Sequence, residues 1–132
     1  MKIDHIGVAV KDLKEAVSLY GKILDKLEVQ IETVPSEHVR VALIPLGETR
    51  IELLEPLDEE SAIAKFIKER GEGIHHIAIS VENVKKEIDK LSSAGLRVLY
   101  HEPAQGSHGK MITFVHPKST RGVLLELCQN PK

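Results

Sequence analysis

The sequence has one cysteine, no tryptophan and no long apolar run, and these shortages exclude several classes of protein. With Cys128 alone, neither an internal disulfide nor a cysteine-based zinc site can form. No stretch approaches the roughly 20 consecutive apolar residues that a membrane-spanning helix requires. The formal net charge of −2 provides no basic surface for a nucleic-acid backbone. We therefore expect neither membrane insertion nor nucleic-acid binding.

The N-terminus also lacks the features of an export signal. Asp4 and His5 interrupt its short apolar stretch, and no small-residue cleavage site follows. The chain has 132 residues, of which 42% are hydrophobic and 29% charged, a composition typical of one soluble folded domain. Together with the lone cysteine, these features predict a single-domain cytoplasmic protein that spans residues 1–132.

The chain contains an internal repeat. The stretch IDHIGVAV at residues 3–10 is repeated as GIHHIAISV at residues 73–81. His5 then matches His76, with an offset of 71 residues (76 − 5). Both stretches are rich in β-branched residues, so each predicts a strand with a histidine near its beginning.

Each half continues with the same order of elements. Apolar residues at helical spacing predict helices over 12–24 and 83–94, and a linking helix over 58–70. Short runs bounded by turn residues predict further strands, over 27–34, 38–45 and 49–55 in the first half and over 97–100, 111–115 and 122–127 in the second.

These elements predict an α+β fold made of two tandem βαβββ modules. The first module is expected over about 1–56 and the second over about 72–130, within one domain. A helix covers only one face of each module's sheet, so the other face must be buried or used. Packing two modules side by side would give a curved mixed sheet with a shared concave face.

Side chains alternate along a strand, so each repeated histidine lies opposite the face that packs under its helix. Small residues share the histidines' face and leave room there for another group: Gly7 and Ala9 in the first strand, Ala78 and Ser80 in the second. Among the other histidines, His75 falls on the core face of its strand. His116 is expected in a loop, where it could touch a substrate.

The last strand of each half carries a glutamate, Glu52 in RIELLEP and Glu126 in VLLELCQ. A carboxylate in an apolar run is costly to bury unless it is paired or binds a cation. If the first and last strands of each half are neighbours, four side chains converge: His5, Glu52, His76 and Glu126. Two imidazoles and two carboxylates suit a divalent metal ion such as Co²⁺, Mn²⁺, Ni²⁺, Fe²⁺ or Zn²⁺. Any one of them alone is more often a structural residue, so the prediction depends on the repeat.

The same segments resemble the vicinal oxygen chelate superfamily, and most closely its methylmalonyl-CoA epimerase family. The resemblance covers nearly the whole chain and is carried by IDHIGVAVKDL, LGETRIELLEPL, GEGIHHIAISV, VLYHEP and ITFVHPKSTRGVLLEL. It implies interconversion of (2R)- and (2S)-methylmalonyl-CoA, a reaction of propionate metabolism. It also implies metal ligation by His5, Glu52, His76 and Glu126, with Glu126 as the base that removes the α-proton.

The sequence departs from some members of this family. Glu52 stands where some members have glutamine, which adds negative charge to the expected site. Val41 stands where certain epimerases carry a glutamate as the second acid/base, and valine cannot carry a proton. Lys110, Lys118 and Arg121 lie in basic loops, where they either meet the CoA phosphates or the substrate carboxylate or are solvated.

We expect Co²⁺ as the cofactor, with Mn²⁺, Ni²⁺, Zn²⁺ and Fe²⁺ as alternatives, and an acyl-CoA thioester as the substrate. A homodimer is expected because a unit of this size leaves sheet edges to cover. Two alternative functions use the same fold: a lactoylglutathione lyase with the same ligands, and a small-molecule-binding protein without catalysis. The segments HHIAISV and HPKS favour the epimerase.

Overall fold

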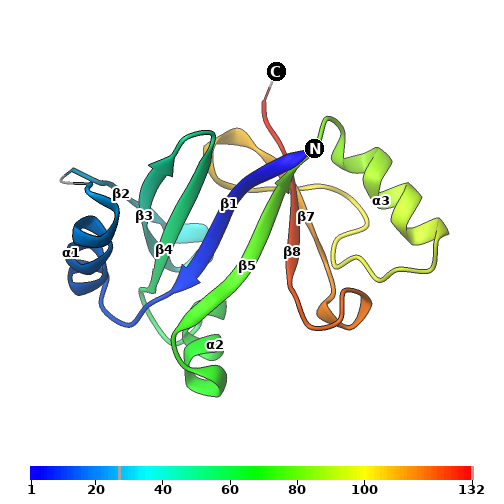
Figure 1. Cartoon of the computed structure of the whole chain (residues 1–132). Coiled ribbons are helices and arrows are strands. Elements are labelled where there is room, and N and C mark those ends of the chain that lie inside the picture. The colour runs from blue at the N-terminus through cyan, green and yellow to red at the C-terminus, as the bar shows by residue number, and fades with distance from the viewer. Residues whose placement is uncertain (27, 132) are drawn as a thin grey trace. The chain divides into compact units, whose positions relative to one another are not determined.

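Strands and helices follow one another in the order that the repeat predicts (Figure 1). The computed structural model describes residues 1–26 and 28–131. Its elements are β1 (Lys2–Ala9), α1 (Leu13–Leu24), β2 (Gln30–Val34), η1 (Pro35–Glu37), β3 (Val39–Leu46), β4 (Thr49–Pro56), α2 (Ala62–Arg70), β5 (Gly73–Ser80), α3 (Val84–Ser93), β6 (Ala104–Gln105), η2 (Ser107–Gly109), β7 (Met111–Val115), η3 (Pro117–Ser119) and β8 (Leu125–Gln129).

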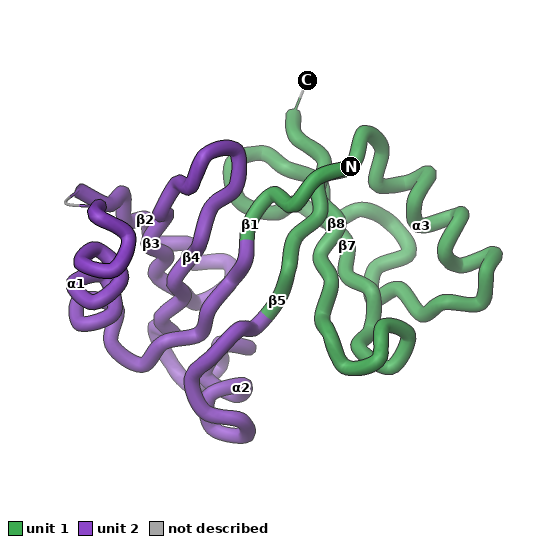
Figure 2. Tube along the Cα trace, viewed as in Figure 1, with its two compact units in different colours: residues 1–5, 76–132 green, residues 6–75 purple. Residues whose placement is uncertain are grey.

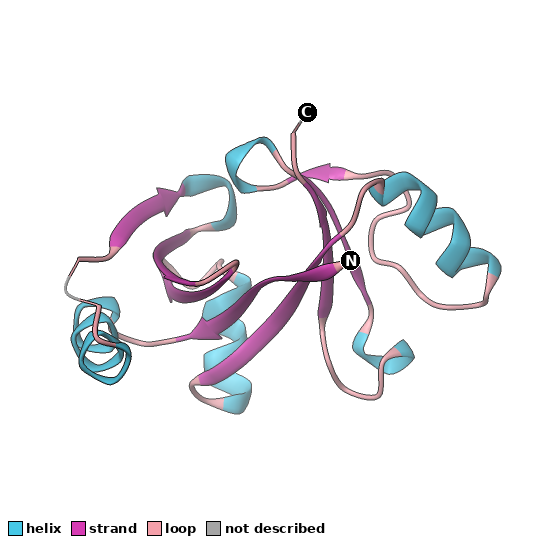
Figure 3. Cartoon of the chain, turned by 45° about the horizontal axis from the view of Figure 1, so that its top comes forward, coloured by secondary structure: helices cyan, strands magenta, loops and turns pink. Residues whose placement is uncertain are grey.

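The predicted α+β class is confirmed. Both halves keep the βαβββ order, β1-α1-β2-β3-β4 followed by β5-α3-β6-β7-β8, with α2 between them. Figure 3 distinguishes the helices and strands from the loops by colour. Among the described residues, no helix combines the length and the apolar character needed to cross a membrane.

The chain divides into two compact units, which Figure 2 distinguishes by colour. Unit 1 comprises Met1–His5 and His76–Lys132, and unit 2 comprises Ile6–His75. The boundaries fall inside β1 and β5, so each of these strands contributes residues to both units. The expected arrangement of two sequential modules within a single domain stays a prediction.

Unit 2 contains an antiparallel sheet in which β3 pairs with β2 on one side and β4 on the other. Gly47, in the two-residue turn between β3 and β4, has a φ of +64°, a conformation that costs glycine little. Helix α1 begins after Asp12, whose carboxylate accepts a hydrogen bond from the Glu15 N–H at 3.0 Å. One face of the sheet and α1 enclose an apolar cluster of Val10, Leu13, Ala42, Ile44 and Leu53.

The opposite side chains of these strands form a second cluster with α2, made of Ala9, Val39, Val41, Leu54 and Ile63. Helix α2 begins after Ser61, whose hydroxyl accepts a hydrogen bond from the Ile63 N–H at 3.1 Å. The prediction of helix from residue 58 is therefore wrong at its start. The Asp58 carboxylate instead accepts a hydrogen bond from the Glu60 N–H at 2.9 Å, in a turn that precedes the helix.

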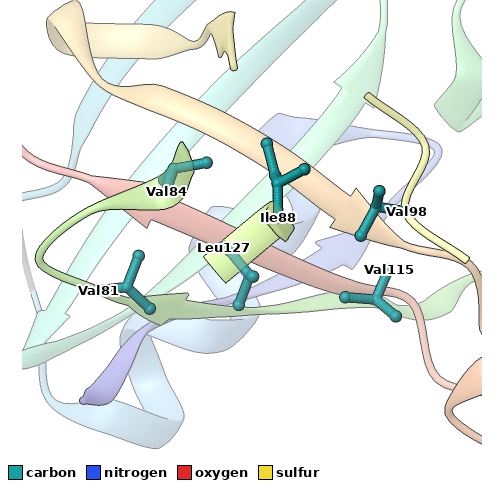
Figure 4. Close-up of a cluster of buried hydrophobic side chains, with 6 residues drawn as sticks. All are labelled: Val81, Val84, Ile88, Val98, Val115 and Leu127. Atoms are coloured by element: carbon teal, nitrogen blue, oxygen red, sulfur yellow. The ribbon is translucent and has the colours of Figure 1, made fainter. Parts of the chain in front are cut away.

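Unit 1 contains a mixed sheet in which β5 runs parallel to β8, while β7 is antiparallel to both β8 and β6. Helix α3 begins after Asn83, whose side chain accepts a hydrogen bond from the Lys86 N–H at 3.0 Å. Its apolar face packs against these strands in the cluster of Figure 4, formed by Val81, Val84, Ile88, Val98, Val115 and Leu127.

The strand predicted over 97–100 is wrong. Only a single bridge, Val98 with Val115, forms there. The Thr113 hydroxyl accepts a hydrogen bond from the Tyr100 N–H at 3.3 Å and donates one to the Tyr100 carbonyl at 2.8 Å. A side chain thus occupies the backbone groups that a strand ladder would use. The first strand after α3 is instead β6, further along the chain.

Two other strands begin later than predicted. The strand expected from residue 122 begins at Leu125, and it follows a turn in which Arg121 and Gly122 have φ values of 61° and 105°. An extended strand cannot include such residues. The strand expected over 27–34 appears as β2 from Gln30, and Leu27 lies outside the described residues.

Candidate active site

Three of the predicted ligand side chains meet within unit 1. His5 on β1 and His76 on β5 approach each other through their Nε2 atoms, which are 3.1 Å apart. Glu126 on β8 lies 3.8 Å from each imidazole, through Oε2 to His5 and through Oε1 to His76. The exposed fractions of these three residues are 6%, 8% and 8%. The structure thus gathers two nitrogen donors and one carboxylate at a buried point.

The pairing of β5 with β8 explains why His76 and Glu126 meet. In this parallel pair Ala78 lies opposite Glu126, and His76 is two residues before Ala78 on the same face. Leu125 and Leu127 point the other way and pack in the α3 cluster. Ala78, between the two side chains' positions on this face, is fully buried. The faces expected from alternation are therefore confirmed for these strands.

A buried ion pair lies directly behind His5. Asp4 Oδ2 is 2.8 Å from His5 Nδ1 and 2.9 Å from Lys110 Nζ. Asp4 is 6% exposed and Lys110 8% exposed. An Nδ1–H that donates to the carboxylate leaves the lone pair on His5 Nε2, the atom that faces His76.

Little in the sequence indicates this ion pair. Alternation places Asp4 and His5 on opposite faces of β1, and 106 residues separate Asp4 from Lys110. The only signal was the charged residue inside an apolar strand stretch. Lys110 was expected in a basic loop, either meeting an anionic group or solvated. In the structure its side chain is instead buried and paired with Asp4.

The fourth predicted ligand, Glu52, belongs to unit 2. It lies on β4 and is 8% exposed. Its Oε2 accepts hydrogen bonds from Nε and Nη2 of Arg50, at 3.2 and 3.0 Å. Arg50 is two residues away on the same strand and so shares its face. The structure therefore supplies a partner for the Glu52 charge, and ligation of a metal by Glu52 stays a prediction.

Comparison with known proteins adds an independent finding. The family profile of the glyoxalase, bleomycin resistance protein and dioxygenase superfamily matches residues 4–114. The chain belongs to this superfamily. It is also 42% identical over 130 residues to an ethylmalonyl-CoA/methylmalonyl-CoA epimerase of Cereibacter sphaeroides, covering 97% of each chain.

Two solved structures are similar along almost the whole length. A protein of Bacillus halodurans described as hypothetical superposes with a TM-score of 0.94 at 46% identity, covering 99% of this chain and 95% of the other. A variant of Streptomyces coelicolor methylmalonyl-CoA epimerase, in complex with 2-nitronate-propionyl-CoA, superposes with a TM-score of 0.88 at 39% identity. That match covers 98% of this chain and 94% of the other.

The donor set of this superfamily member fits a divalent metal ion. Imidazole nitrogen and carboxylate oxygen are common ligands of Zn²⁺ and related ions, with bonds of about 2.1 Å. Such bonds place neighbouring donors about 3.0 Å apart in an octahedron and about 3.4 Å apart in a tetrahedron. The observed separations of 3.1, 3.8 and 3.8 Å lie within an ångström of these values. A cation would also offset the cost of burying Glu126.

Val41, which the family resemblance matches to a glutamate of some epimerases, lies on β3 within unit 2. It is 6% exposed and packs in the cluster that faces α2. Its neighbours across the sheet are Glu32 and Leu54. An apolar side chain in an apolar cluster offers no proton, so a second proton carrier would have to be a different group.

The other residues singled out in the sequence make different contacts from those of the His5, His76 and Glu126 group. His75 packs edge-on against Phe66, with ring centroids 5.0 Å apart, and burial lowers its pKa. His116 lies in the predicted loop, where its Nδ1 accepts a hydrogen bond from the Lys118 N–H at 3.0 Å. Lys118 and Arg121 are exposed. Contact of these loop residues with a substrate stays a prediction.

Proposed function

We propose that this protein is a methylmalonyl-CoA epimerase, an isomerase that inverts the α-carbon of a CoA thioester. The observation that carries the proposal is that the side chains of three buried residues lie close together: His5, His76 and Glu126. It occurs in a chain that aligns with an ethylmalonyl-CoA/methylmalonyl-CoA epimerase over 97% of both lengths. The acyl-CoA substrate class is supported by the complex of the Streptomyces coelicolor enzyme with a CoA thioester.

The reaction requires a base at one face of the α-carbon and an acid at the other. The α-proton lies between a thioester and a carboxylate, which makes it acidic enough for a positioned carboxylate to remove. We assign this step to Glu126: the C–H bond breaks, its electron pair moves toward the thioester oxygen, and the proton passes to a carboxylate oxygen. Delivery of a proton to the opposite face gives the other epimer.

A divalent ion held by His5, His76 and Glu126 would supply Lewis-acid stabilisation of the negative charge on substrate oxygens. We include Glu52 as the fourth protein ligand and Co²⁺ as the ion in this proposal. Two imidazoles and two carboxylates would leave two positions of an octahedron for a bidentate substrate. Metal content after purification in the presence of Co²⁺, for the wild type and Glu52→Ala, tests both points.

The second proton carrier is not assigned to Val41, which cannot titrate. We propose a water molecule or another polar side chain in this role. Under this scheme Glu126→Gln stops proton removal, whereas a conservative Val41→Leu change leaves epimerisation within a few fold of the wild type.

The test follows the α-proton of (2S)- or (2R)-methylmalonyl-CoA in D₂O. We expect exchange of the α-proton together with inversion of the stereocentre, and loss of both on addition of a chelator. Glu126→Gln should lower the rate by at least about 100-fold, the usual contribution of a general base. The folded state of the variant is checked by its thermal melting curve.

Absence of exchange in the protein reloaded with Co²⁺ would overturn the epimerase proposal. Methylglyoxal with glutathione would then test the lactoylglutathione lyase alternative. Exchange that persists at the wild-type rate in Glu126→Gln would instead overturn the assignment of the base and leave the epimerase intact.

Two broader expectations belong to the same proposal. Homodimeric assembly would appear as twice the mass of the 14.7 kDa chain in light scattering. A cytoplasmic location would place the enzyme with its acyl-CoA substrate in propionate metabolism. Fractionation of cells that produce the protein tests the location.

A further inference from the structure

The buried pair of Asp4 and Lys110 takes no part in the proposed reaction, yet it touches the donor group directly. Charged side chains are rarely this buried unless they are paired. Here one carboxylate oxygen, Asp4 Oδ2, meets both the Lys110 ammonium at 2.9 Å and His5 Nδ1 at 2.8 Å. A single atom therefore links the lysine to the histidine.

The backbone around Lys110 is fixed where the side chain leaves it. The Lys110 N–H donates to the Ser107 carbonyl at 3.2 Å, and the Lys110 carbonyl accepts from the Gly106 N–H at 2.8 Å. These bonds close a short loop between β6 and β7, around the 3₁₀ turn η2. The lysine thus reaches Asp4 from an anchored position rather than from a mobile loop.

The position of Asp4 restricts the orientation of His5. A carboxylate at Nδ1 favours the tautomer that carries its proton on Nδ1, which leaves a lone pair on Nε2. His5 Nε2 is the atom 3.1 Å from His76 and 3.8 Å from Glu126. A ring rotated by half a turn would exchange Nδ1 with Cδ2 and Nε2 with Cε1, so it would break the bond to Asp4 and turn a carbon atom toward the other donors.

We propose that Asp4 and Lys110 are positioning residues for His5. Asp4 holds the imidazole in the tautomer and orientation that present Nε2 to a metal ion, and Lys110 holds the Asp4 carboxylate against the ring. The inference rests on the proposed metal site, and it assigns Lys110 a role inside the protein rather than contact with a CoA phosphate.

The first test measures the tautomer of His5 directly, in metal-free protein labelled with ¹⁵N. Long-range ¹H–¹⁵N spectra, recorded above the ordinary histidine pKa of about 6.5, distinguish a protonated ring nitrogen from an unprotonated one. We expect Nδ1 of His5 to be protonated in the wild type. A proton on Nε2 in the folded wild type would overturn the proposal, whatever the activity of the enzyme.

The second test measures Co²⁺ affinity by titration calorimetry. Loss of a carboxylate behind a metal-binding histidine typically costs 10–100-fold in affinity, and we expect this loss for Asp4→Asn. Lys110→Met should weaken binding by a smaller factor. Because the two residues act as one unit, the double variant should bind no worse than Asp4→Asn alone. Lys86→Met, the same change at an exposed lysine of unit 1, should bind Co²⁺ like the wild type.

The outcomes separate this inference from the proposed function. Wild-type Co²⁺ affinity in Asp4→Asn, or additive losses in the double variant, would overturn the positioning role even if the enzyme is an epimerase. A wild type that shows the expected tautomer but no epimerisation would overturn the proposed reaction alone. If Asp4→Asn fails to fold, Lys110→Met and the wild-type tautomer still decide the question. Lys110→Met that binds Co²⁺ normally but binds CoA poorly would assign the lysine to the substrate instead.

Discussion

At the scale of single residues, the histidines of this chain differ in their burial and in the groups that their ring nitrogens contact. His5 and His76 are buried and face another imidazole and a carboxylate. His38 is partly exposed at the end of η1, where its Nδ1 lies 2.9 Å from Asp58 Oδ2. His116 begins η3 and accepts a hydrogen bond from a backbone N–H. The contacts of His38 and His116 each lead to a prediction about pH dependence.

For His38, the hydrogen bond with Asp58 raises the histidine pKa above 6.5 and lowers the Asp58 pKa below 3.8. The raised pKa contributes stability that is complete below pH 6.5 and is lost as the pH rises through the folded value. The lowered pKa contributes stability above pH 3.8 that is lost on acidification. An NMR titration should give a raised His38 pKa in the wild type and a lower one in Asp58→Asn. Equal values in both proteins would contradict the pairing.

For His116, burial lowers the pKa below 6.5, and the charges of Arg97 and Lys118 add to the effect. Protonation removes the acceptor of the bond from the Lys118 N–H, so the cap is complete above pH 6.5 and lost as the pH falls. The Lys118 amide shift should therefore titrate together with the His116 ring. Arg97→Gln should move that shared midpoint upward. A Lys118 amide that does not respond to the ring titration would argue against this cap.

Alternation along strands was enough to predict which site residues share a face. It could not reveal Asp4 and Lys110 as partners, because the two residues are 106 apart in the chain. Alternation also places Asp4 on the face of β1 opposite His5. The burial of Glu52 was foreseeable, whereas its pairing with Arg50 depends on rotamers that a sequence does not specify. Pairwise contacts of long charged side chains were thus the part of the site that remained hidden.

At the scale of elements, the end of α1 shows how a close backbone contact can override helix propensity. Gly21 is a buried residue of this helix, and its carbonyl accepts a hydrogen bond from the Lys26 N–H at 2.9 Å. A Cβ atom at this position would lie 2.7 Å from the Lys26 carbonyl oxygen. The chain that follows the helix therefore folds back against Gly21 and leaves no space for a methyl group.

We expect Gly21→Ala to destabilise the protein, although helix propensity alone predicts a gain of about 1 kcal/mol. Forced overlap of this kind typically costs about 1–3 kcal/mol. Urea unfolding of the variant gives the free energy of unfolding directly. Ser18→Ala, at an exposed position of the same helix, is the matched control and should be neutral or stabilising. A Gly21→Ala variant more stable than the wild type would show that the Lys26 backbone yields.

The helices were predictable because their caps and apolar spacing are local. Asp12 and Asn83 cap α1 and α3, and they are the first residues of the helix ranges that the sequence predicts. The errors occur where a distant side chain or the backbone conformation of a turn decides where a strand forms. Thr113 takes over the backbone groups of Tyr100 from another part of the sheet, and left-handed residues delay the start of β8.

At the scale of the whole molecule, a metal ion bound only by the folded state must raise stability. At a free ion concentration 100 times its Kd, the gain is about 2.7 kcal/mol. We expect the Tm of the wild type to rise with Co²⁺ concentration and the rise to disappear in His5→Ala. His101→Ala, at an exposed histidine that belongs to neither group of possible metal ligands, should keep the full rise. A His5→Ala protein that retains the full rise would place the ion elsewhere.

The position of the donors along the chain has a topological consequence. His5 and His76 are 71 residues apart, and all of unit 2 lies between them. An ion held by both would close that intervening segment into a ring, as a covalent cross-link does, and would anchor an N-terminus that otherwise tends to fray. A protease cut at the exposed Gly47-Glu48 turn would then leave two fragments that stay together while the ion is bound. Chelation would remove that tether.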